Sequence, residues 1–293
     1  MERMKRIGLG LVIGIAAACA PASAWACAVC GAADPTLPVS GVEAPFKNRV
    51  RLTTDARVAA FRAQDASGLV LDERRLDLVP SWAPRDDLLL SATVPIVSRG
   101  IGAMEQVSLG DVEARAIVTL WQTRFAPVRH RLAIGIGLKG PTAPLQRDAT
   151  GRALPTDLQP GCGSIVPILS AYWTVARGPW SLVTSATVMI PTPVRDGPHP
   201  GASMRAGSTG QFQPSRWFGL RVGALARWDT SGAIGDKTDP TSGGAAIYVV
   251  PEVVLSPTTD LVISLGASFP AAQAWRGYRA LGPVALATVS YDF

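Results

Sequence analysis

Long apolar segments are absent from most of this sequence. Beyond residue 20, no run approaches the roughly 20 consecutive apolar residues that a transmembrane helix requires, which excludes a helical membrane protein. Histidine is scarce, and both histidines, His130 and His199, fall in predicted connections, so a histidine-dependent enzyme or metal centre has no basis. The net charge of +6 is small and evenly spread, which argues against a nucleic-acid partner.

Proline and glycine, by contrast, are plentiful and scattered, with 24 and 29 residues in a chain of 293. This distribution disfavours long helices and suits short strands separated by turns. No low-complexity linker or block of charge divides the chain. A single folded domain is therefore predicted over residues 48–293.

The N-terminal end has the three parts of a secretory signal peptide over residues 1–26. Arg3, Lys5 and Arg6 supply positive charge, residues 7–20 form an apolar core, and an A-x-A cleavage site ends at residue 26. Processing as a lipoprotein at one of the early cysteines is the alternative, although neither of those cysteines has the usual leucine three residues before it. Secretion would place the mature chain in the oxidising cell envelope.

The segment that follows, residues 27–47, is proline-rich and without periodicity, so an N-terminal tail or short plug is predicted. Cys27 and Cys30 have C-x-x-C spacing. The plain interpretation is a local disulfide or a dithiol without a catalytic task, and the alternative is a redox or metal role. No histidine follows Cys30, which excludes covalent haem attachment, and no cofactor or metal is predicted. Cys162, the odd cysteine of the mature chain, is interpreted as an unpaired small residue among glycines.

Apolar and polar residues alternate with a period of two through the rest of the chain. The alternation is clearest in residues 107–123, where Val112 and Ala114 alternate with Asp111 and Glu113. Because such faces carry several charges, they must meet water, and the apolar faces must meet something other than water. About twelve strands are predicted on this basis, over residues 49–61, 69–80, 87–97, 107–123, 131–139, 164–176, 180–190, 203–213, 216–228, 245–255, 261–269 and 281–293.

The last predicted strand ends the chain with an aromatic residue. Phe293, Tyr291 and Val289 share one face, and Asp292 and Ser290 lie on the other. This pattern resembles the closing strand of bacterial outer-membrane barrels, which implies recognition by the barrel assembly machinery and contact with outer-membrane lipid. Closure lets a sheet cross a bilayer without an unpaired edge, and bacterial barrels use even strand numbers. The predicted fold class is all-β, a closed antiparallel transmembrane β-barrel located in the cell outer membrane.

Connection lengths support the same topology. With a periplasmic N-terminus, the periplasmic turns are predicted to be short and the outer loops long, which is the asymmetry of bacterial barrels. The short turns are predicted at residues 81–85, 125–129, 177–179, 214–215 and 257–260. The long loops are predicted at residues 98–106, 140–163, 191–202, 229–244 and 270–280.

Charged residues on the polar faces are the candidates for the barrel lumen. Facing charges of both signs are expected to pair with one another and to bind water, which argues against an acid/base enzyme site. Arginine and lysine outnumber the carboxylates, so a weak preference for anions is predicted if the pore conducts ions. The lumen-lining candidates are Arg49, Arg51, Asp55, Arg57, Asp111, Glu113, Arg115, Arg131, Lys139, Arg205, Arg221, Arg227 and Glu252.

Tryptophan recurs near the predicted strand ends. An aromatic ring with a polar nitrogen favours the interface between membrane and water, so membership of an aromatic girdle is predicted rather than ligand stacking. The residues concerned are Trp82, Trp121, Trp173, Trp180, Trp217 and Trp228.

Two runs that frame the longest predicted loop, GLKGPT at residues 137–142 and LQPGCGS at residues 158–164, resemble an outer-membrane family named for the MetA pathway of phenol degradation. Family members read G-L-K-x-P-T-G and Q-P-G-T-G-S, whereas here Ala143 stands where glycine is expected and Cys162 where threonine is usual. The resemblance implies a closed barrel with a transport-like role for small, often aromatic or apolar, compounds. It implies no binding residue.

The function predicted from these observations is an outer-membrane channel or transporter-like barrel for small molecules, with apolar or aromatic compounds as candidate cargo. No enzymatic activity is predicted. The alternative is a non-conducting barrel that acts as an envelope scaffold or binds a partner protein, with a redox or metal role for Cys27 and Cys30.

Overall fold

The structure is a computed structural model, and the predicted signal peptide and all but the last residue of the predicted tail lie outside the residues that it describes. Both boundaries therefore remain predictions. No helix among the described residues is long and apolar enough to cross a membrane. The structure describes residues 47–63, 70–101, 104–123, 126–147, 151, 159–192, 198–234, 237–238, 242–276, 278–280 and 282–293.

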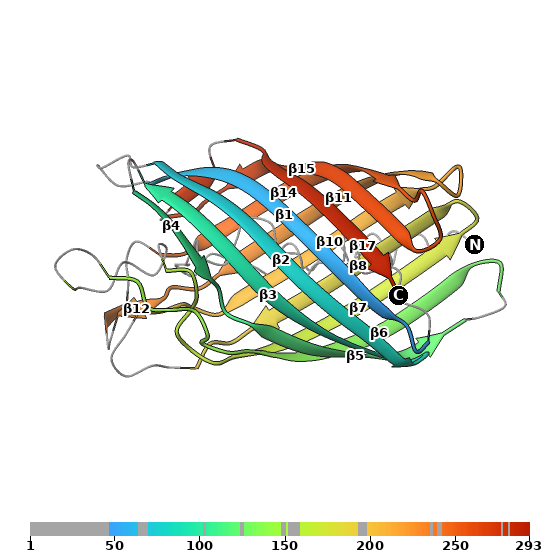
Figure 1. Ribbon diagram of the computed structural model, residues 1–293, viewed down its shortest axis with the longest axis horizontal. Helices are drawn as coiled ribbons and strands as arrows, with labels where there is room; N and C mark the ends of the chain where they lie inside the picture. The colour runs from blue at the N-terminus through green and yellow to red at the C-terminus, as the bar shows by residue number, and fades with distance from the viewer. Residues whose placement is uncertain are drawn as a thin grey trace, which may run out of the picture.

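Twelve long antiparallel strands form one closed barrel, which confirms the predicted fold class (Figure 1). Each long strand pairs with the next long strand, and β1 pairs with both β2 and β17, so the ring of long strands has no free edge among the described residues. The long strands are β1 (Val50–Ala63), β2 (Val70–Arg85), β3 (Leu88–Ile101), β5 (Glu113–Gln122), β6 (Arg129–Lys139), β7 (Val166–Arg177), β8 (Trp180–Met189), β10 (Ser203–Phe212), β11 (Phe218–Asp229), β14 (Gly244–Leu255), β15 (Leu261–Gln273) and β17 (Val284–Asp292).

Shorter strands lie at the end of the barrel that carries the long connections. β4 extends the wall by pairing with the second half of β3, and β16 pairs with the end of β1. Three two-residue strands form a separate small sheet in the order β13-β12-β9. The short strands are β4 (Met104–Leu109), β9 (Pro198–His199), β12 (Ala233–Ile234), β13 (Lys237–Thr238) and β16 (Tyr278–Ala280).

The barrel is inside-out relative to a soluble β-sandwich. In β11, Leu220 and Val222 are 46% and 57% exposed on the outer face, whereas Arg221 and Arg227 are 6% and 4% exposed on the inner face. A sheet with charges inside and apolar side chains outside is stable only where hydrocarbon replaces water around it. The outer surface of the barrel is thus built for lipid contact.

Tryptophan side chains lie on the outer face at the strand ends, as predicted. Five of them lie at the end of the barrel where the connections are short, which we call the short-turn end, and each is between 43% and 61% exposed: Trp82, Trp121, Trp173, Trp180 and Trp217. Trp228 lies at the opposite end, where the connections are long, which we call the long-loop end. His130, expected in a turn, instead belongs to β6, where its ring lies between the rings of Trp121 and Trp173 at centroid distances of 5.9 and 6.2 Å. These rings suit the boundary between hydrocarbon and headgroups.

The strands near β2 are longer than predicted. β2 continues to Arg85, so the turn expected at residues 81–85 lies at residues 86–87 instead. β3 likewise continues to Ile101, into the loop expected at residues 98–106. The apolar alternation ends where hydrocarbon ends, but the ladder of backbone hydrogen bonds continues into water and allows charged residues on both faces.

The strand predicted at residues 107–123 is broken in two. β4 pairs with Ile96–Ile101 and β5 pairs with Leu88–Thr93, and the residues between them, 110–112, bend without belonging to either strand. Gly110 lies so close to β3 that a Cβ there would stand 2.8 Å from Cγ of Pro95. The bend turns the carboxylate of Asp111 toward the interior, where it is 5% exposed.

We expect the two faces of the wall to differ sharply in their tolerance of charge. Ala171→Arg, on the outer face at the middle of β7, should cost about 2 to 4 kcal/mol, whereas Thr174→Arg, which faces an internal cavity on the same strand, should cost under about 1 kcal/mol. Denaturant titration of protein refolded into lipid vesicles measures both free energies. Equal costs would contradict the assignment of the faces.

Candidate functional site

The barrel interior is the candidate functional site. The structure places the predicted lumen-lining residues on the inner face, apart from Arg49, which lies at the rim of the short-turn end and forms an ion pair with Asp260 at 2.6 Å. Nine of them, from Asp55 to Glu252, are under 10% exposed, and Arg51, Arg131 and Lys139 are half-buried. The positions of these side chains relative to one another decide which of their charges are neutralised by a partner.

Most of the inner charges lie in compact pairs. Asp77 is fully buried on β2 between the guanidinium groups of Arg57 and Arg75, with Arg75 Nε at 2.8 Å from Oδ1. Asp55, next to them on β1, accepts a hydrogen bond from the hydroxyl of Thr288 at 2.5 Å. Burial of charge is costly unless partners and hydrogen bonds compensate, so this cluster fixes the wall at β1, β2 and β17.

The opposite walls follow the same rule. Glu113 pairs with Arg115 on β5 and with Lys139 at 3.8 Å on β6. Arg221 of β11 binds Glu252 of β14 at 3.4 Å. In each case the partner is the next residue on the same face of a strand or lies on the neighbouring strand, which is the spacing that the pleated sheet provides.

The end of the barrel with the long connections adds a further pair. Arg227 of β11 pairs with Asp229, whose carboxylate also accepts a hydrogen bond from Ser203 Oγ at 2.5 Å. Arg205 Nε lies 3.3 Å from the same hydroxyl. These groups are 5% exposed or less, so they hold β10 and β11 together rather than present free charge.

Several inner charges were not predicted. Asp292 of β17 pairs through Oδ1 with the predicted Arg51 of β1 at 2.5 Å, and Glu73 of β2 pairs with Arg99 of β3 at 2.7 Å. Glu73 lies within the run Asp72–Arg75, where consecutive charges give no alternation to read, and Arg99 was assigned to a loop. The extra carboxylates make the excess of positive charge along the whole lumen smaller than predicted.

The positive charge is concentrated instead around a cavity of about 780 Å³ at the short-turn end. Its lining includes Arg51, Arg129, Arg131, Arg216 and Arg221, together with glutamine, serine and threonine side chains. No aspartate or glutamate occurs among the described residues that line it. A concave site with cationic walls and no lining carboxylate attracts anions.

Arg131 differs from Arg51 and Arg221 in the kind of partner that it has. Its Nε donates a hydrogen bond to Thr119 Oγ1 at 2.9 Å, and within the described part of the chain it forms no ion pair. Arg51 and Arg221, by contrast, are each held by a carboxylate, Asp292 and Glu252. Arg131 therefore offers guanidinium N–H groups to whatever enters the cavity.

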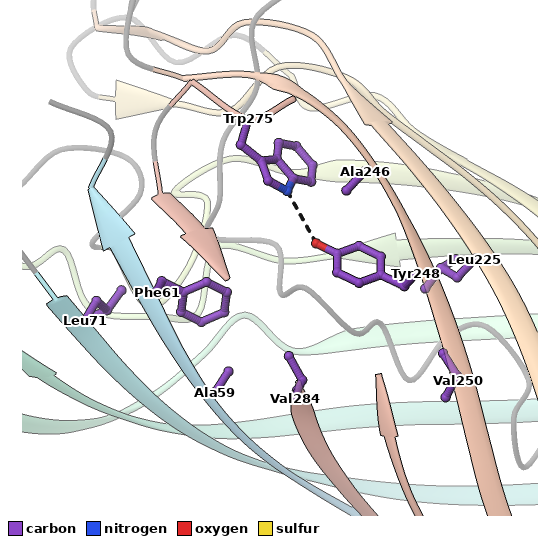
Figure 2. Close-up of a cluster of buried hydrophobic side chains, with 9 residues drawn as sticks. All are labelled: Ala59, Phe61, Leu71, Leu225, Ala246, Tyr248, Val250, Trp275 and Val284. Atoms are coloured by element: carbon purple, nitrogen blue, oxygen red, sulfur yellow. Dashed lines mark hydrogen bonds between the residues drawn. The ribbon is translucent and has the colours of Figure 1, made fainter. Parts of the chain in front are cut away.

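An apolar cluster lies on the inner face toward the other end (Figure 2). Trp275, in the connection after β15, is 8% exposed, and its Nε1 donates to the hydroxyl of Tyr248 at 3.3 Å. The guanidinium carbon of Arg227 lies 5.1 Å from the centre of the Trp275 ring, within range of a cation–π contact. The connection at residues 270–280 was predicted only as a loop, without this anchor.

Of the cysteines of the predicted mature chain, the structure describes only Cys162. Cys27 and Cys30 lie outside the described residues. Cys162 forms no disulfide with a described residue and is 6% exposed. Its surroundings are polar as well as glycine-rich, because the carboxylate of Asp111 lies 2.8 Å from its sulfur. Among the described residues no group of three or more histidine, cysteine or acidic residues could hold a metal ion.

Comparison with known structures gives the fold a precedent. The protein resembles an outer membrane channel from Pseudomonas putida F1, with a TM-score of 0.73 and 14% identity over 87% of this chain and 98% of that chain. This protein is an outer-membrane β-barrel. Two more distant matches are the NanC porin and the CymD monoaromatic hydrocarbon channel. The NanC porin has a TM-score of 0.45 and 10% identity over 82% of this chain and 100% of that chain. The CymD channel has a TM-score of 0.41 and 8% identity over 84% of this chain and 88% of that chain. No family model matches the sequence, and no curated protein matches it significantly.

The charge cluster of β1 and β2 should be essential to the outer-membrane barrel. Asp77→Asn leaves Arg57 and Arg75 buried without their shared carboxylate, so it should lower the free energy of unfolding by about 3 kcal/mol or more. Asp87→Asn is the matched control, because its ion pair with Arg85 is exposed and should contribute under about 1 kcal/mol. Titration with guanidinium chloride measures the free energy of unfolding of both variants. A loss at Asp77 no larger than at Asp87 would show that the buried cluster has no structural role.

Proposed function

We propose that this barrel is an outer-membrane channel for small molecules with a preference for anions. The observation that carries the proposal is the cavity of about 780 Å³ at the short-turn end, which is lined by arginines and polar side chains without a lining carboxylate. Arginine rings favour anions in pores, because they lower the energy of a negative charge that has shed part of its water. The paired charges elsewhere on the inner wall keep the passage polar with little net field.

The chemistry of the cargo follows from the same lining. Arginine donates to carboxylate and phosphate in a fixed fork, so small organic or inorganic anions fit the cavity better than cations or neutral sugars. The resemblance of residues 137–142 and 158–164 to the MetA-pathway family adds apolar or aromatic compounds to the proposed cargo. That second part of the proposal rests on the sequence resemblance alone.

Two structural neighbours are consistent with passage rather than catalysis. The outer membrane channel from Pseudomonas putida F1 shares the fold, and the CymD channel, though distant, is a channel for monoaromatic hydrocarbons. The competing proposal is a non-conducting scaffold, which is favoured by the dense packing of the inner face at the long-loop end, where Phe61, Tyr248 and Trp275 are buried. Conductance separates the two proposals.

Arg131→Gln tests the role of the cavity. In a KCl gradient across a planar bilayer, we expect the wild-type reversal potential to show anion preference. Because a unit charge about 10 Å from an ion in water contributes roughly 0.4 kcal/mol, the variant should reduce that preference by about twofold. Arg85→Gln is the control, because the same charge is lost at the same end but outside the cavity lining. A cation-selective wild type, or equal shifts in both variants, would overturn the proposed selectivity, and absence of conductance would favour the scaffold.

A further inference from the structure

The two runs that carry the family resemblance meet each other inside the barrel. The connection between β6 and β7 is described over residues 140–147 and 159–165, which we call the first and second loop arms. Between them the arms contact Arg99 on β3 and Asp111 in the bend before β5, whose side chains lie on the inner face of the wall. The contacts between arms and wall are polar and specific.

Asp111 joins the two arms. Its Oδ1 accepts a hydrogen bond from the backbone N–H of Ala143 in the first arm at 3.0 Å. Its Oδ2 accepts from the backbone N–H of Cys162 in the second arm at 2.5 Å and from the thiol of Cys162 at 2.8 Å. Within the described part of the chain Asp111 has no basic partner, so its charge is stabilised by donors from the loop arms.

Each arm has a second attachment to the wall. In the first arm, Thr142 Oγ1 accepts from the N–H of Val112 at 2.8 Å and lies 3.2 Å from the carbonyl oxygen of Gly110, to which it donates. In the second arm, the carbonyl oxygen of Gln159 accepts from Arg99 Nη1 at 2.5 Å. These attachments flank Asp111 on either side, so the carboxylate is at the centre of the contact.

The arms also bind each other directly. The backbone N–H of Gln146 donates to the side-chain oxygen of Gln159 at 2.8 Å, and the side-chain amide of Gln159 donates to the carbonyl oxygen of Gln146 at 2.9 Å. Gln159 is 3% exposed. This reciprocal pair stabilises the arms as one unit.

Gly161 explains how closely the arms approach. A Cβ at this position would stand 2.4 Å from the Cβ of Ala143 and 2.4 Å from Oδ1 of Asp111, closer than any real Cβ contact. Both neighbours are short and fixed by hydrogen bonds, so they could not move aside without breaking the contact at Asp111. Glycine is therefore required by the approach of the two arms.

We propose that Asp111 is a latch that holds both loop arms against the inner face of the wall, and that the latched arms set the size limit of the passage. This inference rests on the proposed channel function, because a size limit has meaning only for a barrel that conducts. The QPGCGS run then has a physical role. Gly161 permits the approach, and Cys162 supplies a backbone N–H and a thiol that a threonine hydroxyl would replace.

The latch can be tested without measuring transport. Cys162 is 6% exposed when latched, so its reaction with a membrane-impermeant maleimide reports release of the second arm. In the full-length protein, mass mapping of the peptide that contains Cys162 separates it from other cysteines. Asp111→Ala should raise the rate by about tenfold or more, because each hydrogen bond to a charged group contributes at least that factor to the closed state. An unchanged rate would overturn the latch.

Two further variants remove ambiguity. Glu113→Gln is the matched control, because it deletes the next inward carboxylate on the same wall, whose partners are Arg115 and Lys139 rather than the loop arms. Gly161→Ala disturbs the latch without any change of charge and should label as fast as Asp111→Ala. If Asp111→Ala fails to assemble, Gly161→Ala carries the test, with heat-modifiable gel mobility confirming a folded barrel.

The size limit is tested by conductance and polymer exclusion in planar bilayers. Both latch variants should pass larger polyethylene glycols and conduct more than the wild type, whereas Glu113→Gln should not. Rapid labelling of Cys162 with unchanged exclusion would overturn the size-limiting role. If neither the wild type nor any variant conducts, the channel proposal fails, whereas the labelling result still decides whether Asp111 holds the loop arms.

Discussion

Every other feature of this structure depends on the need to leave no backbone hydrogen bond unmade inside the membrane. The ladder closes where β1 meets β17, through eight aligned residue pairs from Arg51 with Asp292 to Val58 with Ala285. At the end of the seam the N–H of Phe293 donates to the carbonyl oxygen of Val50 at 2.8 Å, and Arg51 binds Asp292 on the inner face. An open edge in hydrocarbon would cost several kcal/mol for each unpaired group.

Closure of the barrel places each side chain of the wall either against lipid or in the interior, and most charges in the interior need a partner. Where the wall is tightly packed, most charges are held by an opposite charge, as Asp77 is by Arg57 and Arg75. Where space remains, at the short-turn end, arginines line the cavity, and Arg131 has only a hydroxyl for a partner among the described residues. The proposed selectivity thus arises at the place where packing no longer enforces pairing.

The alternation of residues predicted the barrel because lipid imposes it locally. β11 follows the predicted faces from Phe218 to Trp228, and its pattern needs no knowledge of distant residues. The same rule fails where hydrocarbon ends, so the extension of β2 to Arg85 and the break before β5 were not foreseen. Interior partners were also out of reach, because Asp111 binds residues 32 and 51 positions away.

The loop arms show a further limit of sequence reasoning. The resemblance of residues 137–142 and 158–164 to a family motif pointed to their importance but gave no physical cause. The structure supplies one, since Ala143 and Cys162 donate to the carboxylate of Asp111 and Gly161 leaves room for both. Thr142 bonds the backbone on either side of Asp111. Cys162, interpreted as an unpaired small residue among glycines, is a hydrogen-bond donor in that contact.

The proposed selectivity requires that the interior at the short-turn end holds water and favours anions. The most direct measurement places a cysteine at Thr174, which lines the cavity, in a background with Cys27 and Cys30 replaced by serine. The rates at which anionic and cationic methanethiosulfonate reagents of similar size block the current are then compared. The anionic reagent should react faster, because the arginines that line the cavity attract it. Faster reaction with the cationic reagent, or no reaction with either, would contradict the proposed selectivity.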